Sequence, residues 1–140
     1  MAINIPTYFK RYAWVCEQLD TQIWRTSFTT ELEDEFDLYV MVGEEWVHFA
    51  VSPFLSKLDP AQQGRVYTAL LRLNQQMRLV YFAVDDEADV NLLAALPVRG
   101  FSYVQFETAL NTLVYYTQTL AREIGRIASE PNFRSSLILD

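Results

Sequence analysis

The sequence predicts an α+β fold in which helices pack on a five-stranded antiparallel sheet. Apolar residues recur every three or four positions in three segments, which is typical of amphipathic helices. In the segments between them the period is two, which is typical of strands. The turns between successive strands are too short to join parallel neighbours. The expected order of elements is therefore α-β-β-β-α-β-β-α, in a single domain over 1–128 with a tail over 129–140.

The first helix is predicted over 6–19. Phe9, Ala13 and Cys16 recur at spacings of three and four and would form one apolar face. Pro6 is tolerated in a first helical turn, where its missing N–H would have no partner.

The segment 22–53 is expected to form a three-stranded meander. Along 36–42 and 47–51 apolar residues occupy alternate positions, so one side of each strand faces a core. The acidic segment 30–34 and Gly43-Glu44-Glu45 are expected to be the turns.

The second helix is predicted from Pro60 to about residue 76. Asp59 is placed as its N-cap, and Gln62 is placed to complete a capping box. Two more strands, over 80–84 and 90–96, are then joined by an acidic turn.

The last helix is predicted from Ser102 to about residue 128. Ser102 and Gln105 have the spacing of a capping box, and Phe101 and Phe106 the spacing of a hydrophobic staple. Pro131 follows as a stop signal, and Leu137-Ile138-Leu139 offers apolar side chains that could dock.

The composition limits the classes of function. The chain has 140 residues, 51% of them hydrophobic, which argues against disorder. Its net charge is −7, and its 11 Lys and Arg are scattered, which argues against nucleic-acid binding. A single cysteine permits no internal disulfide. With no leader pattern and no apolar run near the ~20 residues of a membrane helix, we expect a cytoplasmic location and no membrane partner.

No catalytic, cofactor-binding or metal site is expected. His48 is the only histidine, and it could be a ligand or a pH-sensitive contact, but such sites normally need two or more converging groups. The turn 85–89 lacks the ligand spacing and glycine of an EF-hand loop. Glu17 and Asp20 would raise the pKa of Cys16, which is interpreted as a core residue. The sequence therefore indicates a protein that is not an enzyme.

The sheet carries more apolar residues than one core requires. If one face packs on the helices, the other still carries large apolar and aromatic side chains, where a solvated face is normally polar. Either the second helix and the tail cover that face, or it binds a partner, most simply a second copy of the chain. The candidate partner-binding residues are Trp14, on the first helix opposite Phe9, and Tyr39, Met41, Trp46, His48, Leu79 and Tyr81 on the sheet.

Several local features resemble one known family. They are an opening aromatic helix, a meander whose third strand ends at Ser52-Pro53, the run Leu70-Leu71-Arg72-Leu73-Asn74 before a strand, the acidic turn Asp85–Asp89 and a long closing helix. In this order they resemble the YbjN-like family, described as sensory-transduction regulators, whose members share the fold of type III secretion chaperones. The resemblance implies a twisted sheet with the first and third helices on one side, homodimerisation, and a role in holding or sensing other proteins.

Two functional hypotheses follow. The first is a non-enzymatic, homodimeric protein-binding or regulatory module that buries a partner segment against the outer sheet face or the first helix. The alternative is a small-ligand sensor with a pocket between the sheet and the last helix, lined by Phe106, Tyr115 and Tyr116.

Overall fold

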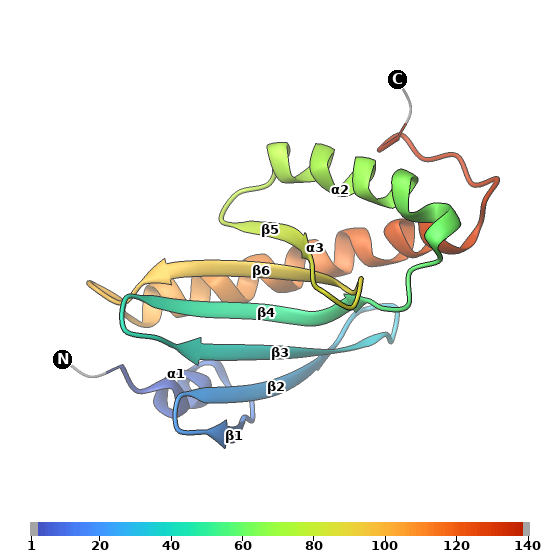
Figure 1. Ribbon diagram of the computed structural model, residues 1–140. Coiled ribbons are helices and arrows are strands. Elements are labelled where there is room, and N and C mark those ends of the chain that lie inside the picture. Colours follow the sequence, from blue (N-terminus) through green and yellow to red (C-terminus); the bar gives the residue numbers. More distant parts are fainter. Residues whose placement is uncertain (1–2, 139–140) are drawn as a thin grey trace.

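The computed structural model describes residues 3–138 and confirms the α+β fold, with six strands instead of five in the described part (Figure 1). The α-helices are α1 (Ile5–Tyr12), α2 (Gln63–Gln76) and α3 (Tyr103–Ser129), with a short 3₁₀-helix η1 (Pro60–Gln62) before α2. The strands are β1 (Glu17–Asp20), β2 (Ile23–Thr29), β3 (Glu35–Val42), β4 (Trp46–Leu55), β5 (Val80–Val84) and β6 (Val90–Pro97).

The additional strand comes from the second half of the predicted first helix. The helix ends at Tyr12 because Ala13 takes a left-handed backbone conformation, with φ of 68°, and its N–H bonds back to the last turn. The chain then turns, and β1 pairs with β2, where Glu17 lies opposite Arg25. The prediction of a helix over 6–19 is therefore wrong beyond Tyr12, and Cys16 lies on no helix.

The sheet is antiparallel throughout, with the strand order β1-β2-β3-β4-β6-β5. The predicted meander is confirmed as β2, β3 and β4, which pair in sequence order. β6 then pairs with β4, and β5 pairs only with β6, so β5 is an edge strand. In Figure 1 α1 and α3 lie behind the sheet, while α2 lies beyond the β5 edge.

The core fills the space between the sheet and the helices α1 and α3. Leu38, Val40, Val47 and Val51 point to that side and are fully buried. From the helices, the rings of Phe9 and Phe106 meet edge to face with centroids 5.0 Å apart, a favourable arrangement for aromatic pairs.

The helix starts follow the predicted caps in part. The Ser102–Gln105 capping box of α3 is confirmed, with the Ser102 N–H donating to Gln105 Oε1 at 3.0 Å. At the start of the second helical segment the Asp59 side chain accepts from the Ala61 N–H at 3.0 Å, and the first turn is 3₁₀. Gln62 completes no capping box there, because its side chain accepts a hydrogen bond from Arg65 instead.

The tail after α3 folds back along α2. The Arg65 guanidinium donates to the carbonyl oxygens of Ile127 and Glu130, each at 3.1 Å, and to that of Phe133. Arg72 donates to the carbonyl oxygen of Leu137 at 3.3 Å. Leu137 and Ile138 are half-buried against the core, while Leu139, also expected to dock, lies outside the described residues. Among residues 3–138 no helix is both long and apolar enough to cross a membrane.

Candidate partner-binding surface

The face of the sheet opposite α1 and α3, here called the outer sheet face, carries large apolar side chains that no described element covers. Figure 1 looks onto this face, and neither α2 nor the described part of the tail crosses it. Alternation along each strand directs one set of residues into the core and the other onto this face. On it, Met41 is 42% exposed, Trp46 46% and Tyr81 42%.

Strand register aligns these residues in rows that run across the sheet. One row crosses all six strands, through Glu17, Arg25, Tyr39, Ala50, Leu93 and Tyr81. A second row, toward the β3–β4 turn, consists of Ile23, Met41, His48 and Ala95. Apart from the Glu17–Arg25 pair and His48, these rows carry no ionisable group except the tyrosine hydroxyls.

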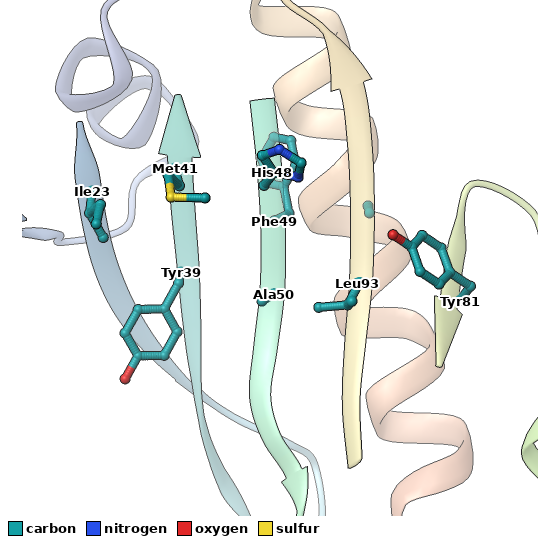
Figure 2. Close-up of a pocket in the computed structure, with 9 residues that line it drawn as sticks. Ile23, Tyr39, Met41, His48, Phe49, Ala50, Tyr81 and Leu93 are labelled. Carbon is teal, nitrogen blue, oxygen red and sulfur yellow. The ribbon is translucent and has the colours of Figure 1, made fainter. Parts of the chain in front are cut away.

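The two rows enclose a shallow groove of about 310 Å³. It is lined by Ile23, Tyr39, Met41, His48, Phe49, Ala50, Tyr81, Leu93 and Ala94. Figure 2 shows Met41 and Leu93 directed toward the central strand β4 from its two sides, with the small side chain of Ala50 nearby. The centre of the groove is therefore low and apolar, and its sides are formed by larger side chains.

A polar row closes one end of the groove. Ser27 donates to the Asp37 carboxylate at 2.7 Å, and the side-chain oxygens of Ser52 and Asn91 lie 2.8 Å apart. These side chains have partners among themselves, so this row marks a boundary of the apolar surface.

Carboxylates surround the groove at both ends. We call the following residues the acidic rim: Asp20, Glu35, Asp37, Glu44, Glu45 and Asp85, in turns or at strand ends. Hydrogen bonds from the backbone N–H groups of Asp89 and Glu87 and from the Asn91 amide lower the pKa of Asp85. The one guanidinium in the rows belongs to Arg25. A hydrogen bond with the Tyr39 side chain and the nearby Glu17 carboxylate, 2.5 Å away, raise its pKa.

Two of the predicted surface residues lie elsewhere. Trp14 follows α1 in a loop, and its ring stacks on Phe28, with centroids 5.6 Å apart, on the helix side of the sheet. Leu79 has a φ of 72°, which breaks the alternation just before β5, and it lines a hollow beside α3. The prediction that Trp14 and Leu79 belong to the candidate surface is therefore wrong, because neither side chain lies on the outer sheet face.

The pocket predicted for a ligand sensor is not formed by its expected residues. Phe106 is fully buried in the core. Tyr115 is 59% exposed, and with Tyr116 it lines a hollow of about 400 Å³ that also includes Arg78 and Leu79. Tyr115 thus lies on the outward side of α3, and Tyr116 is partly buried against the core, so the two do not form the predicted pocket together with Phe106.

The remaining candidate groups stay isolated. Within residues 3–138 no group of three or more His, Cys, Asp and Glu is placed to hold a metal ion. His48 is exposed on the outer sheet face. Cys16 is half-buried, and burial raises the pKa of its thiol. The sequence had suggested the same direction from a different cause, the neighbouring carboxylates.

Sequence reasoning missed three outward-facing residues of the groove, Ile23, Ala50 and Leu93, while the other two lining residues that it did not name, Phe49 and Ala94, are buried in the core. The alternation along the strands could have identified all three. Ala50 and Leu93 each lie between two buried residues, and Ile23 lies next to a buried one. The alternation could not reveal that β6 pairs with β4 and so places Leu93 beside Ala50.

Comparison with solved structures shows the same fold in proteins of low sequence identity. A chain of the ExsC–ExsE complex superposes with a TM-score of 0.59 at 14% identity, covering 84% of this chain and 88% of that one. A chain of the HopA1–SchA chaperone–effector complex gives 0.56 at 12%, covering 83% and 88%. A chain from the complex of the Yersinia pestis type III secretion chaperone SycH with a fragment of YscM2 gives 0.53 at 16%, covering 81% and 93%. The fold is therefore similar to that of type III secretion chaperones.

Comparison of the sequence points to one family. The model of the YbjN family, described as "Putative bacterial sensory transduction regulator", matches residues 13–126. A search of curated proteins returned no significant match. The match covers β1 to most of α3 and agrees with the resemblance found in the sequence.

Proposed function

The chain belongs to the YbjN family, and on that premise we propose that it is a non-enzymatic protein-binding module with a regulatory role. In this proposal the outer sheet face buries a segment of a partner protein. Of the similar solved structures, two are described as chaperones in complex with a partner chain. We carry this mode of action over to the present chain as part of the proposal.

The observation that supports the proposal is the uncovered apolar surface of the sheet. A solvated face of an antiparallel sheet is normally polar, and a contiguous exposed apolar patch is typical of interaction sites. Tyr, Trp and Met, which form much of this patch, are enriched in the cores of protein interfaces.

The proposal that the protein is not an enzyme rests on how few titratable side chains could act together in catalysis. Acid–base or nucleophilic catalysis needs titratable side chains that converge on one place. The chain has one histidine and one cysteine, and the carboxylates near the groove lie around it in turns and at strand ends. The single cysteine also fits the reducing cytoplasm that we propose as its location.

The proposal includes a homodimer, and we expect the second copy at a different surface. An apolar groove of about 420 Å³ lies between α2 and β5, and none of its lining residues is charged: Tyr67, Leu70, Leu71, Asn74, Phe82, Ala83 and Val84. Leu71 is 70% exposed there. Two copies can bury these uncharged side chains against each other, so Leu71→Glu should shift the sedimentation mass from dimer to monomer. Val104→Glu, at a residue 62% exposed on α3, is the matched control.

The binding surface is tested by replacing Tyr39, Met41 and Tyr81 together with alanine. We expect the triple variant to keep its circular dichroism spectrum and to lose the proteins that the wild type retains from a native lysate. The control is a triple alanine variant at Leu32, Val104 and Tyr115, which are at least as exposed but lie in a turn and on α3, off this face. Unchanged retention in the first variant, or equal loss in both, would contradict the assigned surface. A metabolite that raises the melting temperature while no protein binds would instead support a ligand sensor.

A further inference from the structure

The chemistry of the outer sheet face limits what kind of segment can occupy it. β3, β4 and β6, which carry most of the groove, each have a paired neighbour on both sides, so their backbone groups are already used in the sheet. A partner cannot extend the sheet there and must bind through side chains alone. An extended segment would bury its own N–H and C=O groups without partners, whereas a helix satisfies most of them internally.

The dimensions of the groove also fit a helix. From Tyr39 on β3 to Tyr81 on β5 there are three strand spacings, or about 14 Å at ~4.8 Å each. A helix with its side chains is about 10–12 Å across. Between these two tyrosines the row passes through Ala50, whose small side chain leaves the centre low. Along β4, the distance from Trp46 to Ser52 is about 20 Å at ~3.4 Å per residue, which matches a helix of about 13 residues.

The charges around the groove indicate the sign of the partner. The acidic rim places Glu44 and Glu45 near one end and Glu35, Asp37 and Asp85 near the other. The Arg25 side chain in the same row is bonded to Glu17, so its charge is largely compensated. A complementary segment therefore has an apolar stripe with cationic residues toward both ends. A second copy of this chain, with a net charge of −7 and the same rim, would be repelled.

Resting on the proposed function, we propose that the outer sheet face binds an amphipathic α-helix of a different protein, with lysine or arginine flanking its apolar stripe. The helix lies along β4, with its stripe over Ala50 and its cationic ends against the acidic rim. Three to four turns are enough to cover the groove.

The test uses the full chain and synthetic helical peptides of about 14 residues. The first has leucines at positions i, i+3, i+4 and i+7 with lysines at both ends. The second has glutamates in place of the lysines. The third keeps the first composition but is scrambled so that no stripe remains, and the fourth carries two central prolines that prevent a helix. Binding is measured by calorimetry and located by amide chemical shifts.

We expect the lysine-flanked helix to bind at least about tenfold more tightly than each of the other three peptides, with weaker binding as NaCl rises from about 50 to 300 mM. Shifts should concentrate on β3, β4 and β6. Ala50→Lys fills and charges the centre of the groove and should abolish binding, while Val104→Lys, the matched control on α3, should not. If Ala50→Lys fails to fold, Met41→Ala serves instead and should weaken binding several-fold.

The inference is overturned if none of the peptides binds at millimolar concentration, or if the glutamate-flanked or proline-containing peptide binds as tightly as the first. Shifts confined to other surfaces would overturn it too. These outcomes leave the proposed function standing, because the triple alanine variant of Tyr39, Met41 and Tyr81 tests the surface with native partners. Conversely, a triple variant that retains every native partner contradicts the proposed function whatever the peptides do.

Discussion

The side chain of Asn74 on α2 makes two hydrogen bonds to the backbone of Phe82 on β5. Its Nδ2 donates to the Phe82 carbonyl oxygen at 3.0 Å, and its Oδ1 accepts from the Phe82 N–H at 2.7 Å. β5 is an edge strand, and free backbone groups on such an edge are a template for unwanted pairing. Asn74 therefore occupies this part of the edge and attaches α2 to the sheet.

We expect Asn74→Ala to lower the free energy of unfolding by about 1–3 kcal/mol, because two backbone groups lose their partner. The variant should also associate with itself more readily as concentration rises. Urea denaturation and light scattering measure the two effects. Asn132→Ala, at an exposed position in the tail, is the control and should change stability by less than about 0.5 kcal/mol. Equal stability of the two variants would contradict this role of Asn74.

Arg65 is expected to hold the tail on α2. Its guanidinium donates to the carbonyl oxygens of Ile127, Glu130 and Phe133, so Arg65→Ala should cost on the order of 2–3 kcal/mol. Hydrogen exchange should become faster in 130–138 while the strands keep their protection. Arg65→Lys should recover little, because a single ammonium cannot reproduce the planar arrangement of donors. Unchanged exchange in the tail of Arg65→Ala would show that other contacts hold it.

The turn between β5 and β6 should make the protein less stable as the pH falls into the acid range. Hydrogen bonds lower the pKa of Asp85 in the folded protein, so its carboxylate stabilises the fold above the unfolded pKa of about 3.9. That contribution is lost as the pH falls below about 4 and through the lower folded pKa. The stability difference between wild type and Asp85→Ala should therefore be present at pH 7 and shrink in acid. Asp86→Ala in the same turn is the control, with a smaller difference at pH 7.

Two glycines should respond oppositely to replacement by alanine. Gly125 lies within α3, and a Cβ there would have no neighbour within 4 Å, so Gly125→Ala should stabilise by about 0.5–1 kcal/mol. Gly100 has a φ of 79°, where an alanine is strained, so Gly100→Ala should destabilise by about 1 kcal/mol. Thermal melts of the two variants measure both changes, and shifts of the same sign would contradict one assignment.

The period of apolar residues was sufficient for much of the fold. It predicted the meander β2–β4, the α2 segment and the inward sides of β3 and β4, because these depend on neighbours close in sequence. The Ser102–Gln105 capping box was also readable, since both partners lie within one turn. The same alternation placed Tyr39, Met41, His48 and Tyr81 together on the second face of the sheet.

The sequence by itself thus determined that the sheet has two apolar faces where one core needs one. Only the tertiary structure decided which face is covered, because that depends on where α2 and the tail pack. Arg65 attaches the tail to α2, and its partner Phe133 is 68 residues away in sequence. Asn74 attaches α2 to the edge strand β5. Local patterns also could not show that Ala13 ends α1, or that Leu79 and Trp14 turn to the helix side. In each case a backbone conformation or a distant contact outweighs the periodicity, and the outer sheet face remains uncovered.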